Sequence, residues 1–173
     1  MVVWIIGLSG SGKTTLSERV VSDLRARERK VVFLDGDEIR DIFGNDLGYD
    51  INSRMLNAER ICNLSAFLEN QGVDVVCAIL SIFPESRAWC RNNLNNYFEV
   101  FIDNPLEKLI KRDSKGIYKR FSQGEIDNVA GLDLEFIKPK NPDLLINNTG
   151  SLENLLSFSS QICNYISKKM RLQ

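Results

Sequence analysis

The sequence predicts an α/β fold in which a parallel five-stranded sheet is covered by helices on both faces. Two observations predict it. Short apolar segments rich in β-branched or aromatic residues alternate with longer segments whose apolar residues recur at helical spacing. The short segments are apolar throughout, as strands are when helices cover both faces of a parallel sheet.

The expected strands are short and bounded by Gly, Asp, Asn or Pro. Strands are expected at residues 2–6, 31–34, 73–80, 97–102 and 144–146, and helices at residues 13–29, 53–71, 86–95, 105–112 and 151–170. Residues 113–141 are charged, contain three glycines and hold few long apolar runs. This segment is expected to be either a surface excursion or a mobile lid that closes over phosphates. Because no internal repeat or low-complexity linker interrupts the chain, we expect one domain over residues 1–173.

Composition excludes several classes of protein. A chain of 173 residues with 43% hydrophobic residues can bury a core without a disulfide or a metal. The formal net charge of −1 argues against a nucleic-acid or membrane-surface binder. There is no histidine, and the four cysteines form no CxxC pair, so Cys62 and Cys77 are expected to be reduced core residues. The apolar N-terminal segment is too short to span a membrane and has no basic region, which predicts a cytoplasmic protein.

A phosphate-binding loop is expected between the first strand and the first helix. The residues Gly7, Leu8, Ser9, Gly10, Ser11, Gly12, Lys13 and Thr14 match the pattern G-x-x-x-x-G-K-[ST]. The glycines allow backbone N–H groups to surround phosphates, and the helix N-terminus adds its positive dipole end. Lys13 is expected to bridge the β- and γ-phosphates of ATP, Thr14 to ligate Mg²⁺, and Thr15 to complete the ATP-binding set. The alternative is a Gly-rich turn that matches by chance.

The loop alone does not define a kinase. A GTPase would carry an Asn-Lys-x-Asp motif, which does not occur here, and the chain is too short for the usual helicase or transporter cores. A small nucleotide or metabolite kinase remains.

The second strand ends in a polar sequence that runs from Leu34 through Asp35, Gly36 and Asp37 to Arg40. Ligands of open parallel sheets lie at the carboxyl ends of strands. A carboxylate at this position can orient an acceptor hydroxyl or hold Mg²⁺ through water, and an arginine can pair with an anionic substrate. The residues alone leave an alternative open, namely a polar turn in which Asp37 is the N-cap of the next helix.

The Leu-Asp-Gly-Asp-x-x-Arg sequence after such a loop resembles the adenylylsulfate kinase family, and the resemblance extends to about Pro142. Further matches are Leu47-Gly48-Tyr49, Arg54-x-x-Asn57, Ser81 with Arg87, the segment from Phe98 to Leu106, the segment from Arg112 to Arg120, Gly124-Glu125-Ile126, and Gly131-Leu132-Asp133. The resemblance implies a P-loop kinase fold, Mg²⁺ and ATP as cofactors, and phosphorylation of a nucleotide 3′-hydroxyl. It also implies a possible homodimer, because members are commonly dimeric.

The resemblance assigns roles to particular residues. Asp37 would be the base for the acceptor hydroxyl. Apart from the resemblance, the position of Asp35 after the second strand predicts that it joins Thr14 near Mg²⁺. Arg112 would stack on the ATP adenine. The other substrate-binding positions implied are Arg40, Tyr49, Arg54, Asn57, Leu80, Ser81, Lys115, Lys119, Arg120, Asn128 and Val129. Ser81 matches a position described as a phosphoserine; the simpler interpretation is a strand-end hydroxyl that donates to substrate, since in-line transfer needs no covalent step.

Departures from the family pattern cluster on the acceptor side. The proline after the serine is replaced by Ile82, one lid arginine is lost around Phe121, and Val129 replaces a phenylalanine. In the family that phenylalanine and the aromatic residue at Tyr49 enclose the substrate adenine. Loss of one aromatic plate is worth roughly 1–3 kcal/mol of stacking.

Two acceptors follow from these departures. We favour cytidine diphosphoramidate, the substrate of a capsule-biosynthesis member of the family, because a smaller pyrimidine needs less stacking area and leaves room for Phe121. The alternative is adenylyl sulfate. A non-catalytic nucleotide-binding module is the remote alternative; it predicts loss of Lys13, Thr14 or Asp37, and all three are present.

Overall fold

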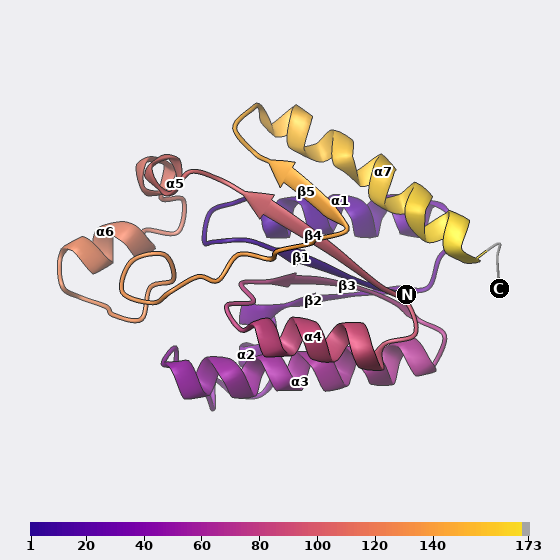
Figure 1. Cartoon of the computed structure of the whole chain (residues 1–173), viewed down its shortest axis with the longest axis horizontal. Coiled ribbons are helices and arrows are strands. Elements are labelled where there is room, and N and C mark those ends of the chain that lie inside the picture. The colour runs from indigo at the N-terminus through magenta and orange to yellow at the C-terminus, as the bar shows by residue number, and fades with distance from the viewer. Residues whose placement is uncertain (171–173) are drawn as a thin grey trace.

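The computed structural model describes residues 1–170 and contains a five-stranded parallel sheet (Figure 1). The strands are β1 (Val2–Ile6), β2 (Val31–Asp35), β3 (Asp74–Ile79), β4 (Tyr97–Asp103) and β5 (Leu144–Asn147). Their order in the sheet is β2-β3-β1-β4-β5, and every pairing is parallel. The predicted α/β fold with five parallel strands is confirmed, and each strand lies within one or two residues of its expected position.

Helices cover both faces of the sheet. Figure 1 shows α1 (Lys13–Ala26) and α7 (Leu152–Met170) on one face, with α2 (Gly36–Ile42), α3 (Ile51–Asn70) and α4 (Pro84–Asn93) on the other. The central strand β1 is buried along its whole length. Because side chains of a strand alternate between faces, Val3 and Ile5 join the core beneath α1 and α7, and Trp4 joins the core beneath α3 and α4.

Two short helices, α2 and α6 (Ile117–Ser122), were not predicted. The strand β2 passes into α2 without an intervening turn, and the N-cap is Asp35, whose carboxylate accepts a hydrogen bond from the N–H of Asp37 at 2.9 Å. The alternative interpretation of Asp37 as the N-cap is therefore wrong. Asp37 instead lies in the first turn of α2, beyond the carboxyl end of β2.

Residues 113–141, here called the lid segment, follow α5 (Leu106–Arg112) and contain α6. Figure 1 shows α5 and α6 beyond the end of the sheet, away from the N-terminus. A third apolar cluster connects the lid segment to the body; it includes Leu8, Ile82, Leu109, Tyr118, Val129, Ala130 and Leu134.

All four cysteines are buried and free, which confirms the expectation for Cys62 and Cys77. Within residues 1–170, no helix is both long and apolar enough to cross a membrane.

Candidate active site

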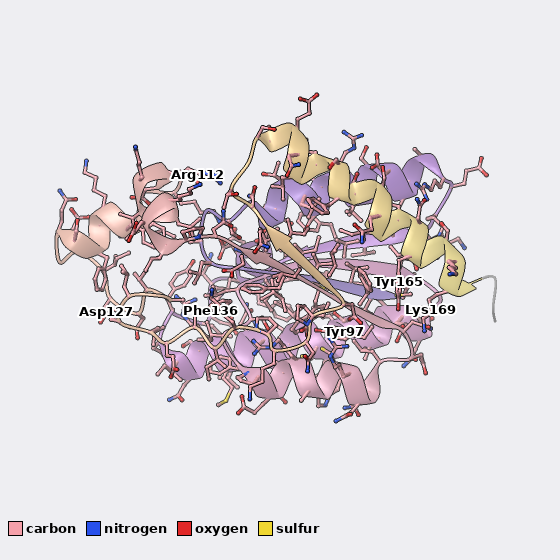
Figure 2. All side chains as sticks on the ribbon, turned by 45° about the horizontal axis from the view of Figure 1, so that its top comes forward. Tyr97, Arg112, Asp127, Phe136, Tyr165 and Lys169 are labelled. Carbon is pink, nitrogen blue, oxygen red and sulfur yellow. The ribbon has the colours of Figure 1, made fainter. Side chains whose placement is uncertain are left out.

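A cleft of about 1140 Å³ opens at the carboxyl ends of β1, β2 and β3. The phosphate loop, the first turns of α2 and α3, the loop after β3, the lid segment and the loop before α7 all contribute to its lining. Arg112 and Asp127, which line the cleft, lie at one end of the molecule, and Tyr165 and Lys169 lie at the other (Figure 2). The cleft is thus at the edge of the sheet where the topology predicts ligands.

The phosphate loop has a backbone conformation that would be sterically strained at Gly7 and Gly12 with any residue other than glycine. Gly12 has φ 99° at the start of α1, and a Cβ on Gly7 would come within 2.8 Å of the carbonyl oxygen of Ile102. Lys13 is the first residue of α1, and its Nζ donates to the carbonyl of Leu8 at 2.9 Å. Burial of this ammonium group, together with the charge of Lys115, lowers the pKa of Lys13 to about 8.

Thr14 and Asp35 come together beside the loop. The hydroxyl of Thr14 donates to Oδ2 of Asp35 at 3.0 Å, and both residues line the cleft. Mg²⁺ in phosphoryl-transfer sites binds one or two protein oxygens and completes its shell with phosphate and water. A hydroxyl and a carboxylate side by side at the loop fit that ion, so Thr14 and Asp35 are the residues that would hold it.

Asp37 and Lys115 form an ion pair across the cleft. Their Oδ2 and Nζ atoms are 3.0 Å apart, and both side chains are about half exposed, at 55% and 51%. Burial opposes the charge of Lys115, but the hydrogen bond and charge of Asp37 outweigh it and raise the pKa of Lys115. The lid segment is therefore held to α2 by charges that face the phosphate loop.

The acceptor side of the cleft is built around one backbone carbonyl. Nη1 of Arg40 and Nδ2 of Asn57 both donate to the oxygen of Gly36, at 3.1 and 3.2 Å. Arg54 connects this region to the lid segment, because its Nε donates to the carbonyl of Tyr49 at 2.6 Å and its Nη2 to that of Asn128 at 2.8 Å. These arginines give the region a positive potential suited to an anionic ligand.

Tyr49 and Val129 both line the cleft, but they differ in setting. The ring of Tyr49 is half exposed and lies near the guanidinium groups of Arg40 and Arg54, at 4.8 and 5.4 Å from the ring centroid. Val129 is buried in the third apolar cluster, against which Phe121 also packs. One aromatic and one aliphatic side chain are thus available to an acceptor base.

Ser81 has a left-handed backbone with φ 52°, which is costly for a residue other than glycine. Nη1 of the buried Arg87 donates to the carbonyl of Ser81 at 2.6 Å, and its Nη2 donates to that of Ile137 at 2.9 Å. Arg87 therefore fixes the loop after β3 against the chain that leads to β5.

The structure brings most of the predicted site residues to this cleft. Leu80 and Ser81 line it after β3, and Arg112, whose Nη1 donates to the carbonyl of Gly10 at 3.1 Å, lines it beside the phosphate loop. Thr15 and Arg120 also line it. The lining does not include Lys119, which is exposed on α6, nor Gly7, Leu8 and Ser11, which are buried.

Sequence reasoning missed the loop between β5 and α7. Asn148, Gly150, Ser151 and Leu152 line the cleft, and Nδ2 of Asn148 donates to the carbonyl of Ser11 at 2.9 Å. Phe83 and Asp127 were missed as well. The β5–α7 loop could have been predicted to line the cleft from the fold alone. In a parallel sheet the loops that follow the strands all lie at the carboxyl ends of the strands.

A Gly-rich loop at the end of the central strand, with an acid and an arginine at the end of β2, defines a P-loop kinase of small molecules. The chain belongs to the adenylylsulfate kinase family: the family model described as "Adenylylsulphate kinase" matches residues 1–147. Members of this family are nucleotide 3′-kinases that use ATP with Mg²⁺, and the chain is such an enzyme.

The proteins similar to this chain include kinases that are named for different acceptor substrates. The chain is 40% identical over 148 residues to cytidine diphosphoramidate kinase of Campylobacter jejuni, covering 86% of each chain. It is 39% identical over 143 residues to a probable adenylyl-sulfate kinase of Pseudomonas aeruginosa, covering 83% of this chain and 67% of that one. The structure of the Mycobacterium tuberculosis APS kinase CysC in complex with AMPPNP and APS superposes with a TM-score of 0.88 at 32% identity, covering 96% of each chain.

Proposed function

We propose that this kinase transfers the γ-phosphoryl group of ATP to the ribose 3′-hydroxyl of cytidine diphosphoramidate. The observation that carries the proposal is Val129, an aliphatic residue that lines the cleft where the resemblance to the family implies an aromatic plate against adenine. A pyrimidine offers less surface for stacking and depends less on a second plate. The 40% identity to the Campylobacter jejuni cytidine diphosphoramidate kinase also supports it.

Three side chains of the cleft would each have a separate role in the transfer. Asp37 would accept the proton of the 3′-hydroxyl while the bond from that oxygen to the γ-phosphorus forms and the bond to the β–γ bridging oxygen of ATP breaks, so that ADP leaves. Lys115 would move from Asp37 to the transferring phosphoryl group, and Lys13 would neutralise charge that builds up between the β- and γ-phosphates. Bound Mg²⁺ would contribute neutralisation of phosphate charge.

Adenylyl sulfate is the second candidate acceptor. Tyr49 retains one aromatic plate in the cleft, and identity to the Pseudomonas aeruginosa protein is 39%. In this case Val129 would lower the affinity for adenine without abolishing turnover.

The deciding experiment measures ADP release with Mg·ATP on both acceptors side by side. We expect a higher kcat/KM with cytidine diphosphoramidate. Val129→Phe should then shift the ratio toward adenylyl sulfate by about tenfold, because a restored plate favours the larger base. Faster turnover of adenylyl sulfate by the unmodified enzyme would refute the proposed acceptor, and an unchanged ratio in the variant would refute the stacking argument.

A further inference from the structure

The backbone carbonyl of Ser11, in the phosphate loop, is bound by a side chain from the far end of the sequence. The N–H of Leu16 donates to the carbonyl of Gly12 at 3.0 Å, so the helical hydrogen bonds begin after Ser11. The carbonyl of Ser11 instead accepts from Nδ2 of Asn148 at 2.9 Å. Asn148 is only 3% exposed and Ser11 is fully buried, so water competes little for this bond.

This bond fixes the direction of the next N–H group. The peptide bond between Ser11 and Gly12 is trans and planar, so its C=O and N–H point in opposite directions. Because the carbonyl points to Asn148, the N–H of Gly12 points away from Asn148. Gly12 lines the cleft, and its N–H has no partner within the described residues 1–170. A backbone donor of fixed direction is therefore left for a phosphate oxygen.

A second buried amide holds Asn148 in place. Asn104 follows β4, is 6% exposed, and donates from its Nδ2 to the backbone carbonyl of Asn148. The N–H of Asn148 donates in turn to the carbonyl of Asp103 at 2.9 Å. Both backbone groups of Asn148 are thus bound to the end of β4, which restricts how far its side chain can move from Ser11.

We propose that Asn148 is a positioning residue for phosphate binding and that Asn104 supports it. Asn148 acts on the peptide and not on the nucleotide: it holds the carbonyl of Ser11 so that the N–H of Gly12 is already directed at the phosphates when ATP binds. Donors that are fixed in advance need no reorganisation during the reaction. Asn148 lies outside residues 1–147, which the family model matches, so its role is assigned from the contacts of this chain. The role does not depend on which acceptor the enzyme uses.

Binding of Mg·ADP tests this role without turnover. Asn148→Ala leaves the carbonyl of Ser11 without its partner, and we expect the Kd in calorimetric titration to rise by about tenfold. Asn148→Leu has nearly the same volume but no donor and should show the same rise, which covers the case of an alanine variant that does not fold. Asn147→Ala is the matched control, because Asn147 is the exposed amide one residue earlier, and its Kd should not change. An unchanged Kd in the Asn148 variants would overturn the inference.

Nuclear magnetic resonance distinguishes positioning from a general loss of structure. The sequence contains two Ser-Gly pairs, Ser9-Gly10 and Ser11-Gly12. Cell-free protein with ¹³C-carbonyl serine and ¹⁵N glycine therefore gives two carbonyl-to-amide signals, and Ser9→Ala removes one of them and so assigns both. In the unmodified enzyme the Gly12 proton should shift downfield with Mg·ADP, because a charged phosphate oxygen accepts a strong hydrogen bond.

The variants decide whether Asn148 causes that shift. At saturating Mg·ADP the downfield shift of Gly12 should largely disappear in Asn148→Ala and Asn148→Leu, and should be reduced to a smaller extent in Asn104→Ala. A full shift in the saturated Asn148 variants would overturn the inference, because the N–H would then reach the phosphate unaided. Loss of the shift in Asn147→Ala would overturn it as well, since any change at the end of β5 would then disturb the loop.

Discussion

We propose Asp37 as the carboxylate that receives a proton from the acceptor hydroxyl, and its position supports this role: it lies in the first turn of α2 and pairs with Lys115 across the cleft. Replacing Asp37 with Asn keeps the shape of the side chain and removes its basicity. We expect kcat to fall by about 10²-fold or more, with ATP affinity near that of the unmodified enzyme. Single-turnover transfer and ATP titration measure the two effects, and normal turnover by the variant would exclude Asp37 as the base.

The pKa of Lys13, lowered to about 8, predicts that ATP binding depends on pH. The ammonium group is charged below that pKa and loses its charge as the pH rises through it, and only the charged form attracts phosphate. Between about pH 7.5 and pH 9.5 we therefore expect the Kd for Mg·ATP to rise by about tenfold. The measurement is calorimetric titration at each pH.

Lys13→Arg provides the control, because a guanidinium stays protonated over this range. Its ATP affinity should be lower overall but nearly independent of pH. The same pH dependence in the variant would mean that another group is responsible.

At the scale of elements, Asp133 fixes the part of the lid segment that lines the acceptor side of the cleft. Its carboxylate accepts hydrogen bonds from the N–H groups of Asn128 and Val129 at 2.7 and 2.6 Å, and Asn128 has φ 59°. Asp133→Ala leaves both N–H groups without this acceptor, and losses of this kind amount to about 1–3 kcal/mol. We expect the acceptor KM to rise by about tenfold, with the ATP KM unchanged.

Glu135→Ala is the companion variant, because Glu135 is an exposed carboxylate two residues further along the same segment. It should leave both KM values as they were. An equal rise in both KM values for Asp133→Ala would indicate general destabilisation of the lid segment in place of a local effect on the acceptor.

Elements differ in how well the sequence predicts them, for physical reasons. The five strands could be predicted because they are continuous apolar segments, and the long helices α1, α3 and α7 have enough residues for their apolar period to be visible. The helices α2 and α6 have 7 and 6 residues, fewer than two turns, so no period can be read from them. Because α2 is so short, the sequence does not show that the helix already begins at Gly36, and Asp37 therefore resembles an N-cap residue.

At the scale of the whole molecule, the order of the strands decides which loops share the cleft. The phosphate loop and the acids after β2 could be predicted because motifs mark them. The β5–α7 loop carries no motif, and its place beside Ser11 follows only from β5 lying at the edge next to β4. Pairings among distant residues, such as Arg54 with Asn128 or Arg87 with Ile137, depend on this arrangement and left no trace in local sequence.

Closure of the lid segment depends on contacts with several other parts of the molecule. Its cations Lys115 and Arg120 are about half exposed, and Lys115 is held by one ion pair to Asp37. Exposed ion pairs contribute only about 0–1 kcal/mol, so in the absence of ligands the Lys115–Asp37 pair should break often. The third apolar cluster still packs the segment on the body, so we expect local opening around Lys115 and α6. Mg·AMPPNP with an acceptor would give these cations phosphates to bind and should hold the segment closed.

Limited proteolysis with trypsin tests this expectation. Cleavage after Lys115, Lys119 and Arg120, followed by mass spectrometry of the fragments, should slow by about tenfold or more when both ligands are present. Cleavage after Lys168, on α7 and away from the cleft, is the internal reference and should keep its rate. Equal rates at all sites with and without ligands would show a rigid surface excursion, and the segment would then have no role as a moving lid.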